Sequence, residues 1–82
     1  MKLTEKTIER ETDRKFKEDS KQLVLDGLNI NSADIIEKYK NLEYLSLRFN
    51  LLSSIEFILN CHNLWVLELQ QNPVLLLPYL DH

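Results

Sequence analysis

The apolar residues of this 82-residue chain recur at one fixed interval along the sequence. Residues 64–82 match residues 42–63 at seven positions when one segment is shifted by 22 onto the other. The matched pairs are Leu42 with Leu64, Leu45 with Leu67, Leu47 with Leu69, Asn50 with Asn72, Leu52 with Val74, Ile55 with Leu77 and Ile58 with Leu80. Such a period indicates stacked structural units, because one unit cannot bury its apolar face alone. It also explains the leucine content, 17 of the 82 residues.

A further shift by the same interval finds a weaker copy of the pattern in residues 21–41. Here Leu28 stands at the asparagine position and Ser20 at the first leucine position, while four apolar positions keep the register: Leu23, Leu25, Ile30 and Ile36. Terminal repeats are expected to be atypical, since one side faces a cap or water. We therefore expect three repeats, over residues 21–41, 42–63 and 64–82.

Each repeat contains a leucine–X–leucine unit, and this alternation predicts a short strand whose leucines enter the core. Three parallel strands are expected on a concave face, with short helices or turns near residues 31–41 and 53–62 on the convex side. The outward strand residues should form a platform, flanked by Phe49 and Trp65. Trp65 has an alternative role, as a lid packed on the preceding repeat. The platform residues are Gln22, Val24, Asp26, Tyr44, Ser46, Arg48, Val66, Glu68 and Gln70.

Asn50 and Asn72 follow the second and third predicted strands, where the chain must turn. An inward asparagine can pair with backbone groups that such a turn leaves without partners. We therefore expect both asparagines to be structural repeat residues.

Residues 1–20 differ from the repeats in their charge. Residues 1–21 hold 13 of the 23 charged side chains, seven basic and six acidic. Thr4 can cap a helix, and Ile8, Thr12 and Phe16 recur every four residues as a narrow apolar stripe. Three opposite-charge pairs at the same spacing support a helix over this region: Glu11 with Lys15, Asp13 with Lys17 and Arg14 with Glu18. We expect a charged capping helix whose polar face is solvated; a partner-binding helix is the alternative.

Residues 41–47 and 63–69 fit the L-x-x-L-x-L-x-x-N-x-L pattern of leucine-rich repeats. The chain resembles the intracellular 22-residue class, typified by the regulatory subunit of protein phosphatase one. Its opening, Met1-Lys2-Leu3-Thr4, and the later Leu23-Val24-Leu25-Asp26 resemble the spliceosomal leucine-rich A-prime proteins and the cilia- and flagella-associated leucine-rich-repeat proteins. Asn60-Cys61-His62-Asn63-Leu64 is similar to the second of these groups. The resemblance implies an α/β leucine-rich-repeat solenoid that acts by binding proteins.

The C-terminal end departs from that pattern. Such proteins usually have four or more repeats and a longer capping segment, whereas Asn72-Pro73-Val74 is followed almost at once by Leu77-Pro78-Tyr79-Leu80-Asp81. An apolar edge near Leu75–Leu80 could be covered by a partner, by a second copy of the chain, or by residues lost through truncation.

Composition excludes several other classes. A single cysteine, Cys61, cannot form an internal disulfide or a cysteine-cluster zinc site, and this favours an intracellular protein. The charged N-terminus and the short apolar runs do not predict a signal peptide or a membrane span. A net charge of −3 is unlike that of a protein that binds the phosphates of nucleic acid. His62 and His82 are the only histidines, and no cofactor, metal or catalytic motif is found.

The sequence therefore predicts a noncatalytic module that binds a protein segment on its concave strand face within a larger assembly. The expected location is cytoplasmic or ciliary, with the nucleus as an alternative. The competing interpretation is a truncated structural fragment of a longer repeat protein.

Overall fold

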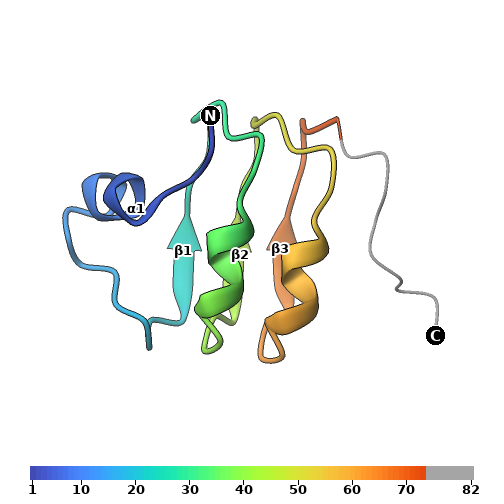
Figure 1. Ribbon diagram of the computed structural model, residues 1–82. Coiled ribbons are helices and arrows are strands. Elements are labelled where there is room, and N and C mark those ends of the chain that lie inside the picture. Colours follow the sequence, from blue (N-terminus) through green and yellow to red (C-terminus); the bar gives the residue numbers. More distant parts are fainter. Residues whose placement is uncertain (74–82) are drawn as a thin grey trace.

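The computed structural model of the chain describes residues 1–73 (Figure 1). Within this range the chain forms one α-helix, two 3₁₀ helices and three strands. In chain order they are α1 (Glu5–Glu11), β1 (Gln22–Val24), η1 (Asp34–Lys38), β2 (Tyr44–Ser46), η2 (Glu56–Asn60) and β3 (Val66–Glu68). The apolar edge at Leu75–Leu80, the compressed C-terminal end and His82 lie outside the described residues. No helix within residues 1–73 is long and apolar enough to cross a bilayer.

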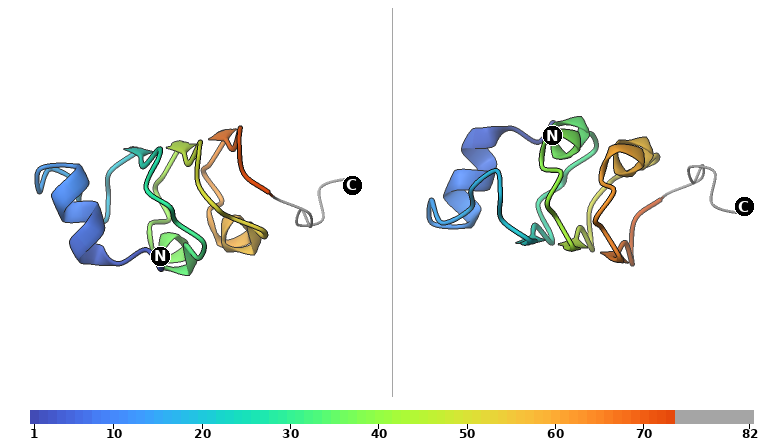
Figure 2. Two further views of the ribbon diagram at one scale, coloured as in Figure 1. Left: turned by 90° about the horizontal axis from the view of Figure 1, so that it is seen from above. Right: turned by 90° about the horizontal axis from the view of Figure 1, so that it is seen from below.

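The three strands form an open parallel sheet in the order β1-β2-β3, which confirms the predicted α/β class. Residues paired on neighbouring strands are 22 positions apart, which is the period of the sequence: Leu23 lies opposite Leu45, and Leu45 lies opposite Leu67. The strands occupy one layer and η1 and η2 the other, with α1 beside β1 (Figure 2). Both 3₁₀ helices fall inside the segments predicted to be short helices or turns.

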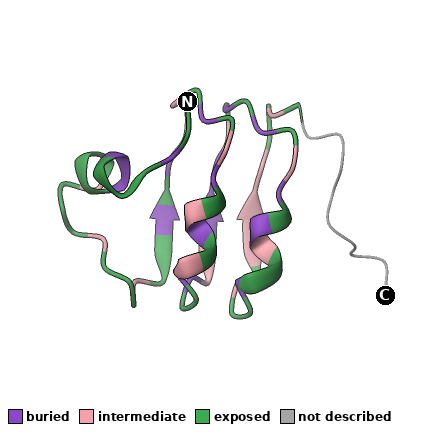
Figure 3. Ribbon diagram, in the orientation of Figure 1, coloured by how far each residue is buried: buried purple, intermediate pink, exposed green. Residues whose placement is uncertain are grey.

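Buried residues occur on β1 and β2 and on the two 3₁₀ helices that pack against the sheet (Figure 3). Leu23 of β1, Leu45 of β2 and most apolar residues of the return segments are at most 5% exposed, whereas Ile35 and Ile58 are half-buried and Leu59 is 54% exposed. In the third repeat, Leu64, Leu67 and Leu69 are only half-buried. Phe57, which the repeat pattern does not single out, is also buried. The buried residues of the first two repeats and the return segments are Leu23, Leu25, Ile30, Ala33, Ile36, Tyr39, Leu42, Leu45, Leu47, Leu52, Ile55, Phe57 and Cys61.

The two repeat asparagines have the structural role that their spacing predicts. The Asn50 side chain accepts from the amides of Leu28 and Ile30, at 3.0 Å each. Its amide group donates to the carbonyls of Leu25, Leu47 and Arg48. Asn72 repeats part of this arrangement one unit later: it accepts from the Leu52 amide and donates to the carbonyls of Leu47 and Leu69. Each asparagine therefore joins the turns of two successive repeats.

The turn before each asparagine position also repeats. Gly27, Phe49 and Gln71 occupy the same position in successive repeats, and all have positive φ, of 69°, 58° and 64°. The left-handed region carries a steric cost for residues other than glycine, and Phe49 and Gln71 adopt it nevertheless. In both turns the next residue is the repeat asparagine, Asn50 or Asn72, whose side chain is hydrogen-bonded to backbone groups of its own and the preceding repeat.

The N-terminal helix is shorter than predicted. Thr4 caps α1 as expected, its Oγ1 accepting from the Thr7 amide, but the helix ends at Glu11. Asp13 and Arg14 then take positive φ, of 54° and 61°, which turns the chain away. The expectation of one helix over residues 1–20 is wrong. The three charge pairs that depended on it are absent from the ion pairs of the described residues.

The reason is the lack of apolar side chains after Ile8. Phe16 is the only apolar residue between Ile8 and Leu23, so a continued helix would bury little. Instead a loop brings Phe16 edge-on to the Tyr39 ring, with 4.8 Å between ring centroids. The residues before the helix are bound as well, since the Leu3 amide donates to the Ser32 carbonyl at 2.8 Å.

Candidate functional site

The strand face, the side of the sheet opposite the leucine core, is the first candidate site. It is formed by the predicted platform residues, and the register of the sheet places them in three rows across β1, β2 and β3. The first row is Gln22, Tyr44 and Val66; the second is Val24, Ser46 and Glu68; the third, just beyond the strands, is Asp26, Arg48 and Gln70.

Asp26 is the centre of one hydrogen-bond network on this face. Its carboxylate accepts from the Ser46 hydroxyl at 2.7 Å and from the Arg48 amide at 2.8 Å. The Arg48 guanidinium approaches the other carboxylate oxygen at 3.2 Å. Burial alone would raise the pKa of the Asp26 carboxyl, but the hydrogen bonds from Ser46 and Arg48 outweigh it and hold that pKa below its ordinary value. The single base of the platform is thus already paired within the molecule.

Tyr44 and Glu68 form a second network beside the first. The Tyr44 hydroxyl donates to one carboxylate oxygen of Glu68, and the Gln70 side chain lies 3.5 Å from the other. This hydrogen bond raises the pKa of the Tyr44 phenol and lowers the pKa of Glu68. Together the two networks fix most polar side chains of the strand face in place.

Ser46 corrects one detail of the predicted platform. Its place on the outer side of β2 predicts that a partner can reach it, but it is fully buried, because Asp26 and Arg48 close over its hydroxyl. Its side chain points to the predicted side and acts there as a support for Asp26. The accessible polar surface is formed instead by its neighbours on the outer rows.

The accessible apolar surface of the strand face lies at its edges and on β1. Val24 is 52% exposed, and the flanking residues Phe49 and Trp65 are 60% and 79% exposed. Trp65 therefore does not serve as a lid over the preceding repeat, which was the alternative role considered for it. Large exposed aromatic rings beside fixed polar groups are typical of protein-binding surfaces.

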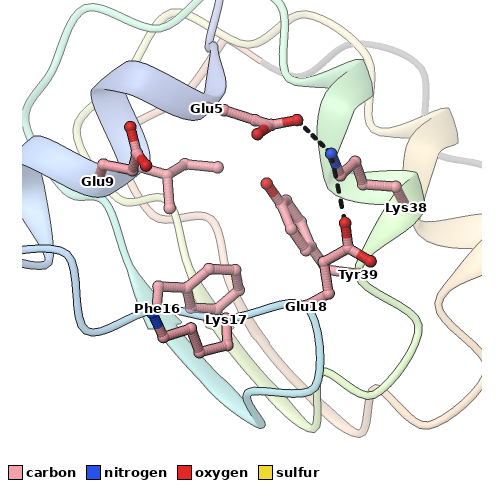
Figure 4. Close-up of a pocket in the computed structure, with 8 residues that line it drawn as sticks. Glu5, Glu9, Phe16, Lys17, Glu18, Lys38 and Tyr39 are labelled. Carbon is pink, nitrogen blue, oxygen red and sulfur yellow. Dashed lines mark hydrogen bonds and ion pairs between the residues drawn. The ribbon is translucent and has the colours of Figure 1, made fainter.

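A cavity of about 210 Å³ beneath α1 is a second candidate site, and the sequence does not predict it (Figure 4). It is walled by α1, by the loop through residues 16–18 and by the end of η1. Its lining residues are Glu5, Ile8, Glu9, Phe16, Lys17, Glu18, Lys38 and Tyr39. The sequence signal is present in part, because Ile8 and Phe16 belong to the predicted apolar stripe; the folding back of the loop could not be foreseen.

Lys38 and Tyr39 dominate the chemistry of this cavity. The Lys38 ammonium pairs with Glu5 and lies 3.7 Å from Glu18, and the pairing with Glu5 raises the pKa of Lys38. The same ammonium lies 5.5 Å from the centre of the Tyr39 ring. Burial, partly offset by this ammonium, raises the pKa of the Tyr39 phenol.

Cys61 is buried, as its repeat position predicts. Its thiol lies 3.8 Å from the carbonyls of Ile36 and Phe57, and burial raises the pKa of the thiol. Within residues 1–73, no cluster of three or more histidine, cysteine or acidic side chains could hold a metal ion.

Comparisons with models of protein families, with curated proteins and with solved structures found no match to this chain.

Proposed function

We propose that this chain is a noncatalytic protein-binding module of the leucine-rich-repeat solenoid type, and that the strand face binds a segment of one protein partner. The observation that carries the proposal is the internal pairing of the polar groups on that face. A partner that docks there meets Asp26 already paired with Arg48 and Glu68 already bonded to Tyr44. The ordering of side chains is a large part of the free-energy cost of association. That cost should be small here, because these side chains are already held in place.

The same pairing defines the kind of segment that would fit. The charges on the strand face are largely compensated by one another. A strongly charged segment would therefore gain little electrostatic free energy by binding to that face. The exposed surfaces of Val24, Trp65 and Phe49 favour apolar side chains on the partner instead. We therefore infer a segment with apolar anchors, flanked by groups that hydrogen-bond to the rim of the platform.

The proposal is tested by comparing three tagged variants with the parent chain in affinity purification from cells. Val24→Lys and Trp65→Ala alter exposed residues of the strand face whose side chains make no hydrogen bond within residues 1–73, so the fold should be retained. Leu59→Ala is the matched control, since Leu59 is 54% exposed but lies on η2, in the opposite layer. Proteins recovered by the parent and by Leu59→Ala should be lost from both strand-face variants. Equal recovery by all four chains would refute the proposed surface.

Tyr44→Ala and Arg48→Ala are poorer choices for this test. Tyr44→Ala removes the hydroxyl bonded to Glu68, and Arg48→Ala removes the guanidinium bonded to Asp26, so a loss of binding could follow from the disturbed carboxylate. Val24 and Trp65 avoid this ambiguity.

A further inference from the structure

We propose that the cavity beneath α1 is a second binding site, and that it accepts an arginine side chain of a protein partner. This site lies on the helix side of β1, away from the strand face, and its existence does not depend on the function proposed for that face. The inference stands on a hydroxyl that opens into the cavity without a protein partner, an aromatic wall and an excess of carboxylates.

The hydroxyl belongs to Tyr39. This residue is only 4% exposed, and its hydroxyl points toward α1 and the interior of the cavity (Figure 4). No hydrogen bond joins the hydroxyl to any residue between 1 and 73, although three carboxylates and two ammonium groups line the same cavity. Every fully enclosed side-chain nitrogen or oxygen in that range has a partner, so the Tyr39 oxygen is reached through the cavity.

A group that enters the cavity can therefore complete the hydrogen bonding of Tyr39. Polar groups in nearly buried positions normally have a partner, from the protein or from outside it. A phenolic hydroxyl can accept from a cation and donate its own proton to a carboxylate. Both kinds of neighbour would be present if a cationic side chain entered.

The charge of the cavity favours a cation. Three carboxylates, Glu5, Glu9 and Glu18, line it against two ammonium groups, Lys17 and Lys38. Glu5 and Glu18 share the single cation of Lys38, while Glu9 has no ion pair among the described residues. A further positive charge would therefore be attracted, and Glu9 is the carboxylate free to pair with it.

The shape and the aromatic wall favour arginine over lysine. The edge-to-face pair of Phe16 and Tyr39 closes one side of the cavity, and Ile8 adds apolar surface. A guanidinium is planar, stacks on aromatic rings and pairs bidentately with a carboxylate, whereas an ammonium is compact and strongly hydrated. The Lys38 ammonium near the Tyr39 ring shows that a cation is tolerated at this wall.

The test is a titration of the isotope-labelled full chain with N-acetyl-arginine amide, followed by NMR chemical shifts at low salt. Saturable shifts are expected in α1, in residues 16–18 and at the end of η1. N-acetyl-citrulline amide, which has nearly the same shape but no charge, should give none. Shifts that do not saturate, or that are equal for arginine and citrulline, would overturn the proposal, and equal affinity for N-acetyl-lysine amide would overturn the assignment to a guanidinium.

Three variants are expected to change the affinity for arginine, two by lowering it and one by raising it. Glu9→Gln removes the available carboxylate and should weaken arginine binding about threefold. Lys38→Met removes the resident cation and should strengthen it by a similar factor of about three. Tyr39→Phe should weaken binding by about two- to tenfold while leaving the unfolding midpoint unchanged, because the lost hydroxyl has no partner within the described chain. Equal affinities in the parent and all three variants would show that the shifts arise elsewhere.

Discussion

Single side chains at the turns connect one repeat to the next. The Asn50 side chain accepts hydrogen bonds from two backbone amides of the first repeat and donates to three backbone carbonyls. A buried backbone group left without a partner costs more than an average hydrogen bond contributes. The period of the sequence is sufficient to predict this role, because an asparagine at a fixed turn position has few other uses.

Asn50→Ala should therefore lower the free energy of unfolding by about 3 kcal/mol, near the upper end of the range for such losses. Asn72→Ala should cost less, about 1 kcal/mol, since Asn72 is half-buried and its side chain makes fewer hydrogen bonds than that of Asn50 among the described residues. Urea denaturation of both variants measures the difference. A loss for Asn72→Ala as large as that for Asn50→Ala would contradict the unequal roles seen in the structure.

The Asp26 network predicts a dependence of stability on pH. The folded-state pKa of Asp26 lies below its ordinary value of 3.8, so its stabilising contribution is complete above that pH and is lost as the pH falls through the folded-state value. The melting midpoint of Asp26→Asn should therefore lie below that of the parent chain at pH 7, and the gap should narrow at pH 2. A gap that is constant with pH would mean that the charge of Asp26 contributes nothing.

At the scale of elements, the repeats and the start of α1 at Thr4 were predictable, and the path of residues 12–20 was not. Burial imposes the leucine spacing on each strand, so the alternation in Leu45-Ser46-Leu47 reveals both a strand and its inner face. Residues 12–20 carry almost no apolar signal, and two long-range contacts tie them to the end of η1: the ion pair of Glu18 with Lys38 and the ring contact of Phe16 with Tyr39. The cavity depends on these contacts, and for this reason the sequence does not indicate it. The burial of Ser46 is equally hidden from the sequence, since it follows from the pairing of Asp26 with Arg48.

The cap of α1 can be tested separately from its packing. The Thr4 hydroxyl accepts from the Thr7 amide, which would otherwise lack a partner at the start of the helix. Thr4→Ala should lower the free energy of unfolding by about 1 kcal/mol, whereas Thr4→Ser keeps the oxygen and should change it little. Urea denaturation followed by circular dichroism distinguishes them. Equal losses in the two variants would show that the methyl group of Thr4 matters and the cap does not.

At the scale of the whole molecule, one core joins all the described elements. Leu3 and Ile8 of the N-terminal region belong to the same buried cluster as the leucines of β1 and β2. No boundary within residues 1–73 separates a capping unit from the repeats. We therefore expect the chain to unfold as a single cooperative unit.

Cys61 provides the measurement for this expectation. Its thiol is buried and its pKa is raised, so it should react with a thiol reagent only when the core opens. The urea midpoint for Cys61 labelling should coincide with the midpoint from circular dichroism. Trp65 is a poor probe by comparison, because it is largely exposed in the folded chain. Labelling well below the dichroism midpoint would reveal that the second and third repeats open separately.

Gly27, Phe49 and Gln71 share a positive φ. The backbone therefore has the same local conformation at the equivalent turn position of all three repeats. The strand of residues 42–63 pairs with the preceding strand on one side and with the following strand on the other, with the same 22-residue offset. A tandem duplication of residues 42–63 would find matching neighbours on both sides and lengthen the sheet by one strand. We expect such a chain to fold with one additional repeat, and its sheet to be wider by one strand.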